Sequence, residues 1–221
     1  GKLGVMTENS DNAFMPATIN PFYMVCYSYN GGETKISADL SSYMNGYQDP
    51  RREIYGVTST FDESENITNG FHGLRVGNEY PIKTGQCYSN VKVEVSSPIM
   101  WMNAAEVMFL RAEAALRGWD TEKTPKAYYE AGIRLSFEQL GAKNVEDYLV
   151  STNTPESYKD PLGTYSFSGT PSTISVQWKD GNFEESLERI ITQKWIANFP
   201  LGLEAWAEFR RTGYPKLMGT A

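Results

Sequence analysis

Histidine and cysteine are scarce in this 221-residue sequence. One histidine, His72, and two cysteines, Cys26 and Cys87, cannot supply an H-E-x-x-H zinc site, a three-histidine site or a four-cysteine site. The G-x-S-x-G, Walker P-loop and G-x-G-x-x-G motifs are absent. Glycine on both sides of His72 is typical of a loop, so we interpret His72 as a loop histidine rather than a catalytic one. The sequence therefore predicts no catalytic set, no metal site and no cofactor.

Basic residues and long apolar stretches are also scarce. The 20 Lys and Arg residues are outnumbered by 27 Asp and Glu residues, which gives a formal net charge of −7. We expect no nucleic-acid partner, because phosphate binding needs clustered positive charge. No apolar stretch reaches the roughly 18 residues of a membrane-spanning helix. Cys26 and Cys87 are compatible with one disulfide or with two free buried thiols, and both alternatives stay open.

Residues 1–97 are rich in turn-forming dipeptides and poor in helical periodicity. We expect an irregular, loop-rich segment with one short helix over residues 37–47, capped by Ser37. The Asp-Pro-Arg-Arg turn that starts at Asp49 is expected to be braced by its own charges. Short extended pieces are expected at three places, residues 52–57, 73–76 and 91–95.

Residues 98–221 read as two helical hairpins. Four helices are expected, over residues 99–117, 124–141, 183–199 and 203–211, with Pro125 at the first position of the second and Asn182 capping the third. A long irregular loop at 151–181 separates the hairpins. The predicted fold class is mainly α, with tetratricopeptide-like hairpins, long loops and a few short strands. Both segments together are expected to form one domain.

One polar stripe marks the first of these helices: Asn103, Glu106, Glu113 and Arg117. Glu106 and Glu113 could act as the carboxylate pair of a glycoside hydrolase, but both project from one rigid helix with backbones about 10.5 Å apart. We therefore favour hydrogen bonds and ion pairs that tie the helix to its neighbours. Arg210 and Arg211 lie near the end of a helix and could clamp an anion, but we favour complementation of the helix dipole and anchoring of a loop. Trp206 is expected in the core.

Tyrosine and tryptophan are frequent, at 14 and 5 residues, and many lie outside the expected helices. A large flat ring with one polar group suits the apolar face of a sugar, although packing is the commoner use of such residues. The candidate ligand-binding residues are Tyr55, Tyr80, Tyr88 and Tyr165.

Several stretches of the sequence together resemble one protein family. They are MWMNAAEV from Met100, FLRAEAALRGW from Phe109, YEAGIRLSFEQLG from Tyr129, LERIITQKWIANFPLGLEAW from Leu187 and the following AEFRRTGYPKL, with SSYMNGYQDPRR from Ser41 earlier in the chain. Their order and spacing resemble the C-terminal region of the SusD/RagB family of outer-membrane nutrient-binding lipoproteins.

The resemblance implies a protein of Bacteroidetes, lipid-anchored at the cell surface on the outer membrane, without enzyme activity. It implies partnership with a SusC-like TonB-dependent transporter and capture of an oligosaccharide or polysaccharide, or in some members of a peptide. An alternative is that this portion mainly docks onto the transporter. The lipobox cysteine and the family's N-terminal helical repeats are not found here, so we expect a fragment lacking the anchor, with more exposed apolar surface than usual.

Overall fold

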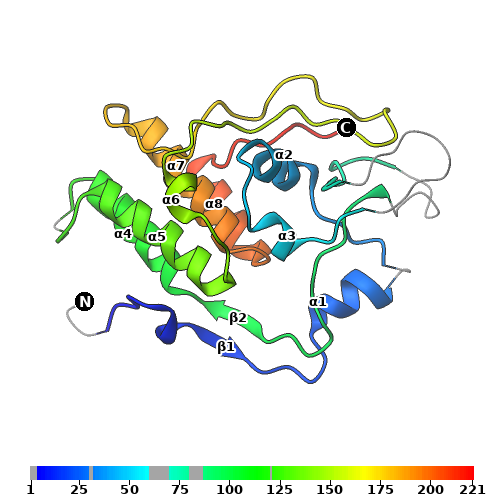
Figure 1. Cartoon of the computed structure of the whole chain (residues 1–221), viewed down its shortest axis with the longest axis horizontal. Coiled ribbons are helices and arrows are strands. Elements are labelled where there is room, and N and C mark those ends of the chain that lie inside the picture. Colours follow the sequence, from blue (N-terminus) through cyan, green and yellow to red (C-terminus); the bar gives the residue numbers. More distant parts are fainter. Residues whose placement is uncertain (1–3, 30–31, 60–69, 80–86, 120) are drawn as a thin grey trace. The chain divides into compact units, whose positions relative to one another are not determined.

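The computed structural model describes residues 4–29, 32–59, 70–79, 87–119 and 121–221, and it is mainly helical (Figure 1). Two compact units are present, each assembled from separate stretches of the chain. Unit 1 comprises Gly1–Met15, Met100–Thr152 and Ile174–Lys216, and unit 2 comprises Pro16–Ile99, Asn153–Thr173 and Leu217–Ala221. The expected division into residues 1–97 and 98–221 stays a prediction.

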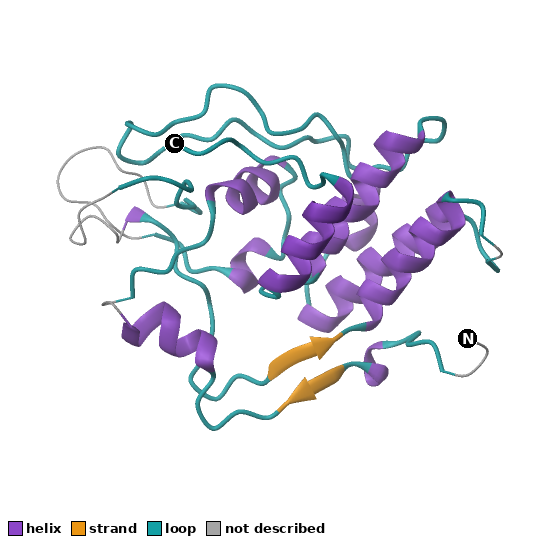
Figure 2. Ribbon diagram, turned by 180° about the vertical axis from the view of Figure 1, so that it is seen from behind, coloured by secondary structure: helices purple, strands orange, loops and turns teal. Residues whose placement is uncertain are grey.

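Unit 1 is built on three long helices, with α4 packed against both α5 and α7. Two short strands, β1 and β2, lie side by side, as Figure 2 shows. The elements are η1 (Asn9–Asp11), β1 (Ala13–Met15), β2 (Ile99–Met102), α4 (Ala104–Leu116), α5 (Pro125–Leu140), α6 (Val145–Leu149), α7 (Phe183–Ala197) and α8 (Gly202–Thr212). The mainly helical class with few short strands is confirmed.

Helix α5 begins and ends where local signals predict. The Thr124 hydroxyl accepts a hydrogen bond from the Ala127 N–H (3.2 Å), and Gly141 adopts the left-handed conformation that terminates the helix (φ 67°). Gly132 allows close approach of α4, because a Cβ there would lie 2.8 Å from the ring of Phe109. The α4–α5 hairpin is therefore confirmed as a tightly packed antiparallel pair.

The prediction of a helix over 99–117 is wrong at its start. Residues Ile99–Met102 form β2, whose backbone groups pair with β1 instead of with the following turn. Asn103 then caps α4, since its side-chain oxygen accepts a hydrogen bond from the Glu106 N–H (2.8 Å). Asn103 is therefore a capping residue rather than part of a helical stripe.

The last two helices, α7 and α8, were expected and are present. Asn182 caps α7 by accepting hydrogen bonds from the N–H groups of Glu184 and Glu185. No residue of α8 is buried, and the expectation that Trp206 lies in the core is wrong: its exposed fraction is 57%. The Lys194 ammonium of α7 bonds the Glu208 carboxylate of α8 at 3.0 Å, so an ion pair links the two helices.

Unit 2 carries shorter elements joined by loops: α1 (Pro21–Tyr23), the π-helical turn η2 (Met24–Ser28), α2 (Ala38–Gly46) and α3 (Arg52–Tyr55). Helix α2 is confirmed, with the Ser37 hydroxyl accepting from the Leu40 N–H at 3.2 Å. Two expected extended pieces are reduced to isolated bridges that join Leu74 to Ser37 and Val91 to Gly56.

The extended piece expected at 52–57 is instead helix α3. The Asp49 carboxylate accepts hydrogen bonds from the Arg51 N–H (2.9 Å) and the Arg51 guanidinium (2.6 Å), and both side chains are fully buried. The Asp49–Arg51 pair closes the turn that leads directly into α3, and this turn favours a helical start at Arg52. The expected bracing role of these charges is confirmed. Across the described residues, none of the helices combines the length and apolar character needed to cross a membrane.

Candidate functional site

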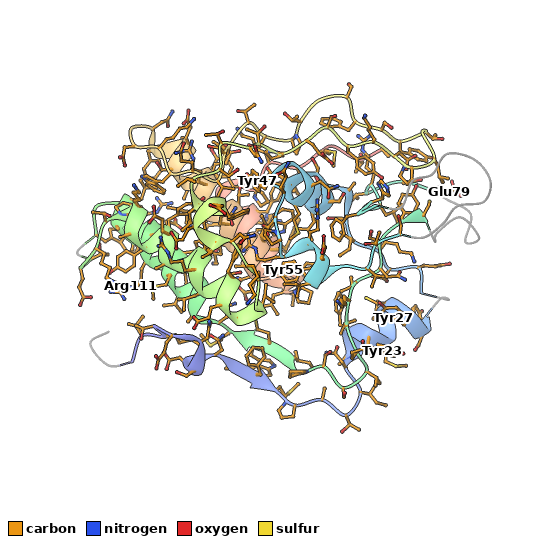
Figure 3. All side chains as sticks on the ribbon, in the orientation of Figure 1. Tyr23, Tyr27, Tyr47, Tyr55, Glu79 and Arg111 are labelled. Atoms are coloured by element: carbon orange, nitrogen blue, oxygen red, sulfur yellow. The ribbon has the colours of Figure 1, made fainter. Side chains whose placement is uncertain are left out.

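Two of the four candidate tyrosines, Tyr55 and Tyr88, are buried in unit 2. Tyr55 ends α3 (Figure 3), and Tyr88 has an exposed fraction of 1%. The Tyr88 hydroxyl donates to Asp160 at 2.8 Å and accepts from the Asn78 amide at 3.2 Å. Burial and the bond to Asp160 raise the pKa of Tyr88, so its hydroxyl stays protonated. Their ligand role stays a prediction, and their burial fits a packing role better.

The other two candidates, Tyr80 and Tyr165, differ in what the structure describes. Tyr80 lies outside the described residues. Tyr165 is partly exposed, and its N–H donates to the Asp160 carboxylate at 3.1 Å. Its hydroxyl reaches the Glu79 carbonyl oxygen at 3.4 Å. Tyr165 is therefore the described candidate best placed to meet a ligand.

A further tyrosine surface was not expected from the sequence. The rings of Tyr23 and Tyr27 stack with centroids 5.1 Å apart and planes 27° apart, side by side in Figure 3. The Tyr27 hydroxyl donates to the Val91 carbonyl oxygen, which fixes that ring. Two residues on, Tyr29 has an exposed fraction of 67%. The four-residue spacing of Tyr23 and Tyr27, one helical turn, is the sequence signal that could have found this surface.

A polar cavity of about 290 Å³ lies in unit 2. Its base is one side of α2, where Ser41 and Asn45 are one turn apart. Residues 71–72 form one wall and residues 156–159 form the other. All of its lining belongs to unit 2.

Hydrogen bonds hold the first wall on α2. The Asn45 amide donates to the Phe71 carbonyl oxygen at 2.9 Å, and the Gly73 N–H donates to the Ser41 hydroxyl at 3.1 Å. The Tyr158 hydroxyl donates to the Gly73 carbonyl oxygen at 2.6 Å, which joins the segment of the first wall to the second wall.

The second wall packs on α2 by backbone contact. The Glu156 N–H donates to the Ser42 carbonyl oxygen at 3.1 Å, and the Ser42 hydroxyl donates to the Glu156 carbonyl oxygen. Gly46 makes this approach feasible, since a Cβ there would lie 2.3 Å from the Thr154 carbonyl oxygen. Both walls are thus fixed to one helix, and the cavity is preformed.

Two opposite charges border this cavity. Glu156 and Lys159 are both exposed, and within the described residues the structure records no hydrogen bond or ion pair for either side-chain charge. Beside them stand the amide of Asn45 and the partly exposed ring of His72. His72 is thus a loop histidine, as expected, but one that lines a cavity.

The carboxylates Glu106 and Glu113 of unit 1 are engaged in ion pairs. Lys194 lies 3.3 Å from Glu106, while Arg117 and Arg211 both bond Glu113. Burial alone would raise the pKa of Glu113, but the bonds from Arg211 and Arg117 outweigh it and hold that pKa below its ordinary value. These contacts tie α4 to α7 and α8, which confirms the structural interpretation over a hydrolase pair.

Both cysteines are free and buried, so the open question of a disulfide resolves to two thiols in this structure. Burial raises the pKa of Cys26, and it raises the pKa of Cys87 to about 11. Over the described part of the chain, no three His, Cys, Asp or Glu side chains lie close enough together to hold a metal ion.

The helical hairpins and loop-borne tyrosines define a mainly helical protein of the tetratricopeptide-like type. The chain belongs to the SusD-like family, whose model, described as SusD and RagB outer membrane lipoprotein, matches residues 1–221. This family is not one of enzymes, so no catalytic activity is assigned to the chain. The search of curated proteins found no match.

Solved structures of SusD homologues resemble the chain closely. One from Bacteroides thetaiotaomicron has 45% identity and a TM-score of 0.91, over 99% of this chain and 46% of that one. One from Bacteroides ovatus has 48% identity and a TM-score of 0.90, over 98% and 46%. A chitin-binding SusD homologue from Flavobacterium johnsoniae has 40% identity and a TM-score of 0.88, over 99% and 45%. The chain thus spans slightly less than half the length of these relatives.

Proposed function

We propose that this chain is the glycan-contacting part of a non-catalytic nutrient-binding protein. The observation that carries the proposal is the tyrosine surface of unit 2, where Tyr23 stacks on Tyr27 and Tyr29 is exposed. Aromatic rings present a flat apolar face to the C–H side of a sugar and keep a hydroxyl at the edge. The family match and the chitin-binding homologue at 40% identity support the same function.

The finer parts of the proposal come from the family. The full protein is lipid-anchored at the outer face of the outer membrane and works with a SusC-like TonB-dependent transporter. The family's description as outer membrane lipoproteins supports this location. Oligosaccharide or polysaccharide is the proposed ligand, and Tyr165 and Tyr80 are kept as proposed contacts beside the tyrosine surface.

A second candidate function is docking, and one observation favours it. Along α8, Leu203 and Trp206 have exposed fractions of 84% and 57%, and the Arg210 guanidinium lies 5.4 Å from the Trp206 ring centroid. Positions three and four apart share one face of a helix, so these side chains form an apolar stripe on a helix with no buried residue. Exposed stripes of this kind are typical of protein-interaction surfaces.

Native affinity electrophoresis tests the first candidate. The chain is run through gels containing a panel of polysaccharides, and retardation by at least one glycan is expected. Tyr29→Ala and Tyr23→Ala should each weaken that retardation about tenfold, which corresponds to the loss of about 1.4 kcal/mol of binding free energy per aromatic contact. Retention by peptides but by no glycan would replace the glycan proposal with peptide capture.

Co-purification with the transporter tests the docking candidate. Leu203→Ser with Trp206→Ser should reduce recovery of a TonB-dependent transporter with the anchored, full-length protein. Trp119→Ser is the matched control, because Trp119 is also exposed in unit 1 but lies outside α8. Equal recovery for both variants would contradict a role of the α8 stripe.

A further inference from the structure

We propose that the cavity on α2 binds one ring of a neutral sugar and selects against acidic glycans. This inference rests on the proposed glycan binding and adds a site and a substrate class to it. The cavity is separate from the tyrosines of α1 and η2, since it is formed by α2, residues 71–72 and residues 156–159.

The size of the cavity sets the size of its occupant. At about 290 Å³ it lies at the lower limit of ligand pockets, which range from about 300 to 1,000 Å³. A single sugar ring fits such a volume, while an extended chain would have to run out of it. The buried rings of Phe71 and Tyr158 contribute the apolar part of the lining.

The two charges of the cavity determine which sugar it accepts. The Glu156 carboxylate accepts hydrogen bonds and the Lys159 ammonium donates them. A sugar hydroxyl does both, so adjacent hydroxyls satisfy the two charges with bonds stronger than neutral ones. The Asn45 amide adds a further polar group on the α2 side.

The same charges disfavour charged ligands. A uronate or sulfate drawn to Lys159 would also face Glu156, and like charges in one site repel. The net charge of −7 adds repulsion of polyanions at long range. A ligand that is polar but uncharged meets neither penalty. Charge therefore selects neutral glycans over acidic ones with the same backbone.

The walls make the site rigid before a ligand arrives. Four hydrogen bonds already described fix the walls to α2 or to each other: Asn45 to Phe71, Gly73 to Ser41, Glu156 to Ser42 and Tyr158 to Gly73. Because these bonds fix both walls, binding does not have to order them, and rigid sites lose less conformational entropy on binding.

Matched pairs of polysaccharides test the inference. Starch is compared with carboxymethyl starch, and hydroxyethyl cellulose with carboxymethyl cellulose, in affinity gels over a range of concentrations. The unchanged chain should bind a neutral member about tenfold more tightly than its carboxymethylated partner. Lys159→Met should weaken neutral binding about tenfold, and Glu156→Gln should reduce the preference for the neutral member.

The chain offers a matched control outside the cavity. Lys92→Met removes an exposed charge of unit 2 that does not line the cavity, and this variant should change neither binding nor preference. Thermal unfolding of every variant establishes that the fold is intact.

Failure of the cavity and failure of glycan binding give different results. If the unchanged chain binds a neutral glycan but the cavity variants bind it equally well, the cavity proposal is wrong and glycan binding stands. Equal affinity of the unchanged chain for neutral and carboxymethylated members also overturns the cavity's selectivity. If neither these pairs nor any other polysaccharide of the panel retards the chain, both proposals are wrong.

Discussion

The guanidinium of Arg211 bonds the carboxylate of Glu113 through two parallel hydrogen bonds, each 2.6 Å long. Arg211 belongs to α8 and Glu113 to α4, and the carboxylate is almost fully buried. Arg117 adds a third bond to the same carboxylate at 2.8 Å. Because α8 buries none of its own residues, this polar contact is one of the main features that hold it on unit 1.

Glu113→Gln should destabilise the chain. The amide keeps the shape but loses the charge that both arginines bind, and hydrogen bonds to charged groups are worth about 1.5–3 kcal/mol each. We expect a loss of about 1–3 kcal/mol in the free energy of unfolding, since the arginines are partly exposed and water compensates in part. Denaturant unfolding measures it.

Glu130→Gln is the control for this variant. Glu130 pairs with Lys126 and Arg134 at one-turn spacing, and all three side chains are partly exposed. Exposed pairs contribute about 0–1 kcal/mol, so its effect should be smaller. If both variants lose the same free energy of unfolding, the buried Glu113 contacts contribute no more to stability than the exposed Glu130 pairs.

The stability difference between wild type and Glu113→Gln should depend on pH. Arg211 and Arg117 hold the pKa of Glu113 below its ordinary value of 4.5. A carboxyl with a lowered pKa in the folded state stabilises the fold above its unfolded pKa, and this contribution is lost as pH falls through the folded pKa. The difference should therefore be full at about pH 6 and shrink steadily below about pH 4.5. A constant difference down to about pH 2 would be inconsistent with this pairing.

Gly46→Ala should destabilise unit 2 although alanine favours helices. The added Cβ would lie 2.3 Å from the Thr154 carbonyl oxygen and 2.4 Å from the Glu156 nitrogen, and both are backbone atoms. Overpacking of this kind costs about 1–3 kcal/mol, more than alanine gains from helix propensity. Thermal unfolding should show a lower midpoint, and glycan affinity should fall because the second wall of the cavity moves.

Gly202→Ala distinguishes this clash from a general effect of alanine. Nothing lies within 4 Å of a Cβ at Gly202, the first residue of α8. The substitution should therefore be neutral or slightly stabilising. A higher midpoint for Gly46→Ala would mean that residues 154–156 do not pack against α2 as described.

The two thiols should resist labelling until the chain unfolds. Cys26 and Cys87 are fully buried, and the pKa of Cys87 rises to about 11 from the ordinary 9.0. Thiolate is the reacting form, so at pH 8 its population falls about 100-fold before limited access is counted. Mass spectrometry after iodoacetamide should find both unmodified in folded protein and both modified in denaturant. A pair that resists labelling in non-reducing denaturant would instead be a disulfide.

Helix ends were predictable where the signal is local. Thr124, Pro125 and Gly141 each act through their own backbone or side chain, and α5 starts and stops as expected. The strand β2 was not predictable, because Ile99–Met102 has a helical apolar pattern and pairs instead with β1, more than eighty residues earlier. The five-residue α6 is too short to show a period.

The candidate site was harder to predict than the fold. Tyr55 and Tyr88 were predicted to bind a ligand, but both are buried. The sequence does not show their burial, because it depends on contacts between distant residues, such as that of Tyr88 with Asp160. The stacking of Tyr23 on Tyr27 could have been predicted, since the two residues are one helical turn apart in the sequence. The cavity could not be predicted, because it is formed by α2 and two segments that are distant from it in the sequence.

The N–H of Met218 donates to the buried carboxylate of Asp39 at 2.6 Å, and the Ala221 N–H donates to the Val76 carbonyl oxygen at 2.9 Å. Unit 2 is thus closed by residues that a ribosome adds about 180 positions after α2 begins to appear. Most of unit 1 is synthesised after α2 and before Met218, the residue whose N–H binds Asp39 of α2. Contacts this distant in sequence form slowly, so the completion of unit 2 should be a late step of folding that follows the synthesis of residues 217–221.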